Sequence, residues 1–316
     1  MEFPEVIPWS LAVLPSDFGG TAQVPAGSSV APRTWTASHG VVGMAAFGRA
    51  EWLADGMNTA GLSAHLLYMA GFCSYQDFTG DGSDLSEMEL MAFLLGTCAS
   101  LDEVRAAMED VNVWGIDPGM GFPPPAHFLL HDETGSLAIE FHPEGHRVVE
   151  NPLGVGTNSP YLDWHLTNVQ NYVGLRPANP ASLTLGNESF NPIGQGQGLK
   201  GMPGDFTPPS RFIRALTMVS VSDQPADGAA SERLALHIAN HFDIVPGLVR
   251  EPGPDGTLID EVTVWTSICN ITGKRYAYRT LDDPTTYVVD LAETDFSGAP
   301  RTTALPGVGG FTTVSV

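Results

Sequence analysis

Short apolar or alternating runs that end at turn residues dominate the chain. Residues 41–49 (VVGMAAFGR) and 61–69 (GLSAHLLYM) predict two strands, joined through the segment DGMN, which contains a Gly turn signal. The clearest hairpin is expected at 126–142, where two strand-like runs flank the turn DETG. Near the C-terminus TVWTSICN and RYAYRTL flank ITGK as another hairpin, and TTYVVDL adds a third strand. This pattern favours mostly antiparallel sheets.

Segments with the spacing of an amphipathic helix are fewer and lie between the strand groups. Ser86 is a candidate N-cap for EMELMAFLLGTC, and LDEVRAAMED follows it directly. Two more helices are predicted at 211–220 and 231–242. From 173 to 210 the chain is rich in Pro and Gly without periodicity, and loops this long are usually functional or form an interface. We therefore predict an α+β fold in a single domain spanning 1–316.

The charge balance limits which partners are plausible. The chain holds 36 acidic and 14 basic residues, which gives a formal net charge of −22. Because such a charge repels nucleic acid and anionic lipid, neither is an expected partner. No run reaches about 18 consecutive apolar residues, so no transmembrane helix is predicted. We interpret the acidic bias as a solvated surface.

The spacing of the cysteines and histidines does not indicate a disulfide framework or a metal site. Cys73, Cys98 and Cys269 are too few and too scattered for a disulfide framework or a zinc site, so small buried side chains in a reducing compartment are expected. His237 and His241 stand at i and i+4, but the Glu of an HExxH zinc helix is missing. We therefore expect no metal site.

Two stretches point more directly to a site. GVGTNSPYLDWH places Asn158 between a strand-like run and a helix, and an Asn amide can donate to a developing oxyanion, although turn chemistry is an alternative reading. GDFTPPSRFIR places Arg211 in the first turn of an apolar helix. A cation there opposes the helix dipole, which suggests that Arg211 faces an anionic or polar group.

Together with others, these stretches resemble the choloylglycine hydrolase family, which contains penicillin V acylases and conjugated bile acid hydrolases. The matching segments follow the family's order over almost the whole chain: 53–75, 123–141, 154–175, 194–214 and 264–270. The resemblance implies a four-layer αββα N-terminal nucleophile hydrolase fold. It also implies that the stretch 173–210 is an extended loop that helps to assemble a homotetramer.

The resemblance assigns roles to four residues. The asparagine of the family's TNSP motif falls on Asn158, as an oxyanion-hole side chain, and the arginine of its GDFTPxxRF motif falls on Arg211, which orients the nucleophile. A further oxyanion position falls on Tyr68, and Tyr resembles the penicillin V acylases more than the bile salt hydrolases. Glu2 stands where the family more often has Asp, which holds the amine of the nucleophile.

The family's nucleophile is an N-terminal cysteine, whose free α-amine acts as the base. Met1-Glu2-Phe3 matches the end of the family's Arg-x-Met-[Asp/Glu] motif, and the cysteine and arginine that precede this motif are absent from the chain. The three internal cysteines lack a free α-amine. We therefore hypothesise that the native protein is longer by roughly 20 residues, enough for one hairpin.

The predicted function is hydrolysis of a linear amide C–N bond, with no metal or cofactor. Substrate candidates are phenoxyacetyl-type penicillins, glycine- or taurine-conjugated bile acids, and N-acyl homoserine lactones. The alternatives are an inactive protein of the same fold that binds without cutting and, less favoured, an assembly scaffold. The default location is the cytoplasm, unless a preceding segment carries an export signal.

Overall fold

An eight-stranded antiparallel sheet forms the centre of the molecule. The computed structural model describes residues 2–3, 7–253 and 256–310. Its large sheet has the order β12-β11-β10-β7-β6-β5-β2-β20. The strands are β2 (Trp9–Leu14), β5 (Val41–Ala46), β6 (Leu53–Asn58), β7 (Ser63–Tyr68), β10 (Ala126–Asp132), β11 (Gly135–His142), β12 (Gly145–Glu150) and β20 (Arg301–Ala304).

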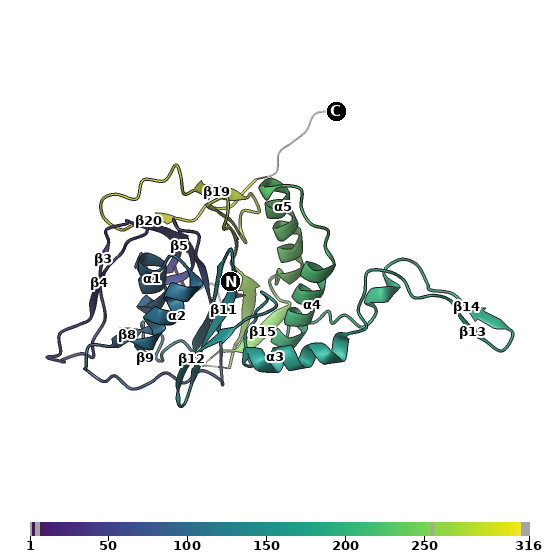
Figure 1. The fold of residues 1–316 in the computed structure, drawn as a ribbon, viewed down its shortest axis with the longest axis horizontal. Coiled ribbons are helices and arrows are strands. Elements are labelled where there is room, and N and C mark those ends of the chain that lie inside the picture. The colour runs from purple at the N-terminus through teal and green to yellow at the C-terminus, as the bar shows by residue number, and fades with distance from the viewer. Residues whose placement is uncertain (1, 4–6, 254–255, 311–316) are drawn as a thin grey trace.

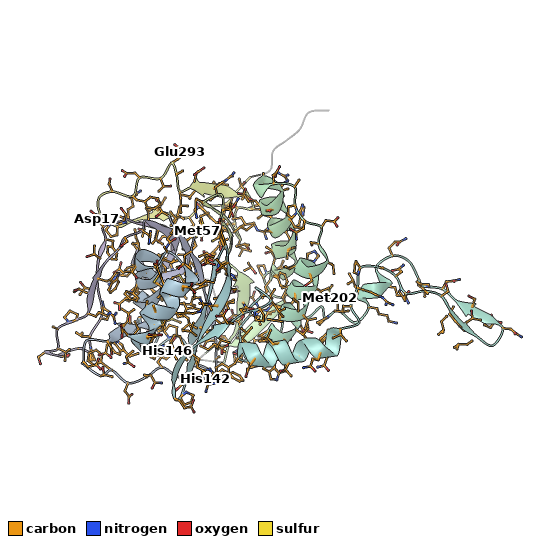
Figure 2. All side chains as sticks on the ribbon, in the orientation of Figure 1. Asp17, Met57, His142, His146, Met202 and Glu293 are labelled. Carbon is orange, nitrogen blue, oxygen red and sulfur yellow. The ribbon has the colours of Figure 1, made fainter. Side chains whose placement is uncertain are left out.

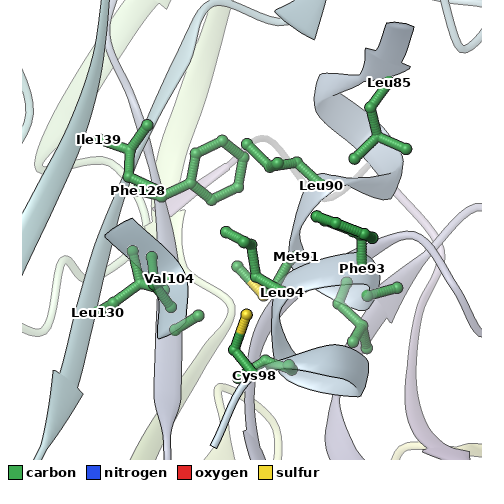
Figure 3. Packing of buried hydrophobic residues seen from close by; sticks show 14 of the residues in the cluster. Leu85, Leu90, Met91, Phe93, Leu94, Cys98, Val104, Phe128, Leu130 and Ile139 are labelled. Atoms are coloured by element: carbon green, nitrogen blue, oxygen red, sulfur yellow. The ribbon is translucent and has the colours of Figure 1, made fainter. Parts of the chain in front are cut away.

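Two helices cover one face of this sheet (Figure 1). In α1 (Glu87–Thr97) ten of eleven residues are buried, and α2 (Leu101–Glu109) turns Leu101, Val104 and Met108 inward. Figure 3 shows Leu90, Met91 and Leu94 of α1 beside Phe128 of β10. The predicted N-cap Ser86 holds that position, but its hydroxyl donates to Glu89 Oε2 instead of accepting from the helix backbone.

The opposite face carries a second layer of strands and then three helices. One group is β17 (Trp265–Asn270), β18 (Arg275–Thr280) and β19 (Tyr287–Asp290), and the other is β1 (Glu2–Phe3), β15 (Val249–Pro252) and β16 (Leu258–Thr263). Met57, labelled in Figure 2, packs with Trp265 and Tyr276 between the two sheets. The helices are α3 (Leu162–Asn168), α4 (Pro208–Val221) and α5 (Gly228–Ala239).

The layers therefore run helix, sheet, sheet, helix, and the predicted α+β class is confirmed (Figure 1). Among the described residues no helix is long and apolar enough to cross a membrane. The remaining elements are short: β3 (Gly19–Thr21), β4 (Thr34–Thr36), β8 (Asp84–Ser86), β9 (Asn112–Trp114), β13 (Leu183–Leu185), β14 (Glu188–Phe190), and the 3₁₀ turns η1 (Val169–Tyr172), η2 (Gln197–Leu199) and η3 (Asn240–Phe242).

The prediction that DGMN forms a turn was wrong, because these four residues end strand β6. Gly56 is needed there for close packing: a Cβ on it would lie 2.9 Å from the carbonyl oxygen of Val42 on β5. The turn follows at 59–62, where Asn58 Oδ1 accepts from the backbone N–H groups of Ala60, Gly61 and Leu62 at 3.0, 2.9 and 2.9 Å. A buried side chain thus closes this hairpin.

The stretch 173–210 is more structured than the sequence predicted. It contains the hairpin β13–β14, which projects away from the layered body in Figure 1. Large apolar side chains on and beside this hairpin face solvent: Leu183, Leu185, Phe190 and Ile193 are 57, 59, 55 and 93% exposed. An exposed apolar surface of this kind is typical of interaction sites.

The buried carboxyl group of Glu87, in the first helical layer, makes a testable contribution to stability. Its side chain is 1% exposed and accepts from the N–H of Ile116, and burial raises its pKa to about 8. Because the folded pKa lies above the unfolded value of 4.5, the stability it contributes is present at low pH and lost as the pH rises toward 8. We expect Glu87→Gln to raise the free energy of unfolding by roughly 2 kcal/mol at pH 8.5.

The measurement is urea unfolding of both proteins at pH 5 and pH 8.5. The gain should largely disappear at pH 5, where Glu87 is protonated. The exposed Glu109, on α2, gives the matched control Glu109→Gln, which should shift neither curve. An equal gain for Glu87→Gln at both pH values would contradict the assigned protonation.

Candidate active site

A cavity of about 270 Å³ lies between the large sheet and the second layer. Its walls come from β6, β7, β16 and β17, from the segment after β12, from α4 and from the end of α5 with η3. Tyr68, Asn158 and Arg211 all line it, although they are far apart in the sequence. The structure thus brings three of the four predicted site residues together.

The Asn158 amide is fixed at both ends. Its Nδ2 donates to the backbone oxygen of Tyr68 at 2.7 Å, and its Oδ1 accepts from Arg211 Nη2 at 2.6 Å. These two partners define which end of the amide is nitrogen. Since an amide NH₂ group has two donor hydrogens, Asn158 keeps the capacity to donate to a second acceptor.

Arg211 reaches this amide from the first turn of α4. The helix begins with Pro208 and Pro209, which supply the fixed backbone angle favoured at a helix start, and the Arg211 N–H donates to Thr207 O at 3.0 Å. Phe212 and Ile213 follow and are buried against Leu129 of β10. The apolar face of α4 therefore anchors the helix while Arg211 points to the site, as its unusual position in the first turn suggested.

His165 forms a hydrogen bond with the backbone of Asn158, and the sequence analysis did not identify it. It is 2% exposed, its Nε2 donates to the backbone oxygen of Asn158 at 3.2 Å, and its ring stacks on Phe212 at a centroid distance of 4.9 Å. Burial lowers the pKa of His165, which favours the neutral ring with the proton on Nε2. The sequence signal was weak, because seven residues separate His165 from Asn158.

Tyr68 lines the cavity with its side chain, whereas only the backbone of Glu2 is described. Tyr68 ends β7 and is 36% exposed. Burial raises the pKa of Tyr68, and the negative charges of Glu261 and Glu251 raise it further. The backbone of Glu2 pairs with Thr263, a cavity residue, but the Glu2 side chain lies outside the described part of the chain.

Asp55, His65 and Ser267 form a polar cluster in the cavity wall that sequence reasoning missed. Asp55 is 4% exposed, and its Oδ2 lies 2.8 Å from His65 Nδ1 and accepts from the Ser267 hydroxyl at 2.7 Å. Burial alone would raise the pKa of Asp55, but His65 and these hydrogen bonds outweigh it and lower the pKa. Asp55 is therefore an ionised carboxylate beneath the cavity.

The internal cysteines do not have the environment of a nucleophile. Burial raises the pKa of Cys73, Cys98 and Cys269, in the case of Cys98 to about 11. Reactive cysteines have a lowered pKa instead. His237 and His241 are exposed, and the described residues contain no group of three or more side chains suited to hold a metal ion.

Comparison with solved structures identifies the fold class of this protein. A solved variant of the conjugated bile acid hydrolase from Clostridium perfringens superposes with a TM-score of 0.85 at 28% identity, covering 100% of this chain and 94% of that one. Penicillin V acylase from Agrobacterium tumefaciens shares the fold, with a TM-score of 0.76 at 20% identity, over 97% of this chain and 86% of that one. The fold is that of the N-terminal nucleophile hydrolases.

The family follows from sequence. Residues 20–303 match the family model described as linear amide C-N hydrolases, choloylglycine hydrolase family. The bile salt hydrolase/transferase of Clostridium perfringens is 31% identical over 268 residues, which cover 83% of this chain and 80% of that protein. This chain therefore belongs to the choloylglycine hydrolase family, and its class of reaction is hydrolysis of linear amides.

The role of His165 can be tested through catalysis. We expect His165→Phe to keep the stack on Phe212 but to remove the donor to Asn158 O, and so to lower kcat about tenfold with little change in KM. Steady-state amide hydrolysis, with the melting temperature of each protein, separates this effect from unfolding. His237→Phe on the exposed face of α5 is the control. An unchanged kcat would show that His165 does not position Asn158.

Proposed function

We propose that this protein hydrolyses a linear amide with a cysteine nucleophile that a segment preceding Met1 provides. The relatives named above act on bile salts and penicillin V, and N-acyl homoserine lactones are a third candidate substrate. The observation that supports the proposal is the register of β1, because a strand that continued β1 upstream would run toward the cavity.

The register is explicit at two residue pairs. Glu2 pairs with Thr263 and Phe3 with Val262, in an antiparallel ladder. If the ladder continued, residues upstream of Met1 would lie beside Trp265–Asn270, which is strand β17. Among the described strands β17 pairs only with β18, so its other edge is open to such an addition. Since Thr266 and Ser267 of β17 line the cavity, the added strand would border Asn158 and Arg211.

In the proposed reaction the α-amine of the cysteine takes the thiol proton, and the thiolate attacks the acyl carbonyl. The second N–H of Asn158 and the Tyr68 side chain donate to the oxyanion, while the Arg211 guanidinium stabilises negative charge beside it. Collapse of the intermediate breaks the C–N bond, and the leaving amine takes the proton. Water then attacks the thioester, which releases the carboxylic acid and restores the thiol.

An inactive binding protein of the same fold is the alternative, and one observation favours it. Each internal cysteine has a raised pKa, so the chain contains no substitute for an N-terminal nucleophile. The arrangement at Asn158 supports the enzyme instead, because pure binding does not require an amide that both Arg211 and Tyr68 hold in place.

The nucleophile is tested first on protein purified from its native source. We expect N-terminal sequencing and intact mass to reveal a chain longer by roughly 20 residues that begins with cysteine, a length that is enough for one hairpin. Alkylation of this cysteine should abolish amide hydrolysis. A soluble, folded protein that begins at Met1 or Glu2 would leave the binding alternative.

The oxyanion role is tested by Asn158→Ala. Loss of one such donor typically lowers kcat by about 10²–10³. Asn171→Ala, on the exposed turn η1, is the matched control and should leave kcat unchanged. A loss of less than about threefold for Asn158→Ala would contradict the assignment.

We also propose that the chain is a single domain and that the stretch 173–210 assembles it into a homotetramer. The exposed apolar side chains of the hairpin β13–β14 support this, since they are unusual on a monomer surface. Replacing residues 181–192 by a short Gly-Ser linker should convert a tetramer into smaller species, measured by light scattering after gel filtration. An unchanged mass would place the assembly surface elsewhere.

A further inference from the structure

The segment that carries Asn158 runs beside the backbone that continues from β7. Three of its side chains donate to backbone oxygens spaced two residues apart: Asn158 to Tyr68 at 2.7 Å, Ser159 to Ala70 at 3.0 Å, and Tyr161 to Phe72. Helix α3 begins directly after Tyr161, and the first backbone N–H group of a helix has no acceptor within the helix. Whatever holds the start of α3 therefore also helps to place Asn158.

Glu140 of β11 provides an acceptor at this point. Its Oε1 accepts from the N–H of Leu162, the first residue of α3, at 2.7 Å, and Glu140 is only 3% exposed. Tyr161 occupies the N-cap position, but its side chain makes no capping hydrogen bond. Glu140 thus provides, from a strand of the large sheet, the kind of acceptor that an N-cap side chain usually provides.

The alternation of side chains along β11 directs Glu140 toward α3. Ala138 packs in the same apolar core as Leu162. Since side chains two residues apart on a strand share a face, Glu140 and His142 face this core as well. The His142 ring stacks on Tyr161 at a centroid distance of 3.9 Å. Strand β11 therefore contacts two consecutive residues, Tyr161 and Leu162, through alternate side chains.

Helix α3 connects this contact to the amide of Asn158. His165, three residues after Leu162, donates through Nε2 to Asn158 O at 3.2 Å. Because α3 is only seven residues long, its first turn and its contact with Asn158 form together. The described residues that line the cavity do not include Glu140. Glu140 therefore acts on the site through α3 and not by contact with a substrate.

The contact with Leu162 does not depend on the charge of Glu140. Burial raises the pKa of Glu140, and the hydrogen bond from Leu162 acts against that shift. A carboxyl group can accept a hydrogen bond in its ionised and in its protonated form, and the amide oxygen of glutamine accepts as well. Glutamine at this position should therefore keep the contact. Aspartate is shorter by one methylene group and should lose it.

We propose that Glu140 is a positioning residue for amide hydrolysis, because it holds the start of α3 and so places the Asn158 amide for the oxyanion. The inference rests on the proposed function, since it assigns a supporting residue to the same oxyanion site. An interaction that acts only on the transition state changes the rate of the chemical step and leaves substrate binding largely unchanged.

Steady-state hydrolysis by variants of the native, full-length protein tests this role. We expect Glu140→Asp and Glu140→Leu to lower kcat about tenfold or more, with KM changed less than about twofold, because a displaced catalytic group is costly mainly in the transition state. Glu140→Gln should keep kcat within about threefold of the unmodified protein, because its amide oxygen still accepts from Leu162. Glu133→Leu, on the exposed turn between β10 and β11, is the matched control and should change neither constant.

The melting temperature of each variant separates displacement of Asn158 from unfolding. If Glu140→Leu does not fold, the comparison of Glu140→Asp with Glu140→Gln decides. Equal kcat values for these two variants would overturn the proposal. A loss that appears in KM and leaves kcat unchanged would overturn it as well.

An NMR measurement that needs no turnover keeps the two proposals apart. In protein with isotope-labelled asparagine, the side-chain NH₂ signals of Asn158 are identified by their loss in Asn158→Ala. We expect Glu140→Asp to shift these signals clearly more than Glu140→Gln does. If the protein hydrolyses no amide but the signals shift in this way, the proposed function fails and the positioning role stands. If Glu140→Asp leaves the signals in place, the positioning role fails, whatever the turnover.

Discussion

The amide of Asn158 is the contact on which the site depends, because it joins three parts of the chain that are far apart in the sequence. Its nitrogen holds the end of β7 through Tyr68 O, and its oxygen holds α4 through Arg211. His165 fixes its backbone from α3. Each hydrogen bond between a neutral pair is worth only about 1 kcal/mol net, but the bond to the guanidinium is stronger. The position of the amide is therefore set by three contacts together.

This contact requires the helices of the last layer to lie close to the large sheet. Phe212 and Ile213 meet that requirement by packing on Leu129 beside Val155 and Leu162, so α4 reaches the first sheet directly there. Nearer β17, by contrast, strands lie between sheet and helices, with Trp265 buried against Val42 and Met44. The cavity occupies the boundary between these two kinds of packing. Its position follows from the layers rather than from any one loop.

Much of the fold could be predicted from local pattern. The hairpins at 126–142 and around 271–274 were correct, because turn residues and alternation specify a hairpin within a few residues. The prediction of a turn at DGMN was wrong because Gly56 is there for close packing against β5. That contact is not visible in the local sequence pattern. Asn158 and Arg211 were identifiable because motif and helix position marked them. The sequence analysis placed Asp55 in the DGMN turn and His65 in a strand. Their partnership, with Ser267 about two hundred residues away, exists only after the layers pack.

Two buried carboxylates show how the layers divide stability from function. Glu87, the first residue of α1, accepts from backbone N–H groups, among them that of Ile116, but desolvation dominates and raises its pKa to about 8. Asp55 is also buried, yet His65 and Ser267 face it and its pKa is lowered. At neutral pH the first layer therefore keeps its acid largely neutral, at no electrostatic consequence for the cavity. Asp55 stays charged beside the cavity instead, because the effects of His65 and Ser267 on its pKa outweigh the desolvation that burial causes.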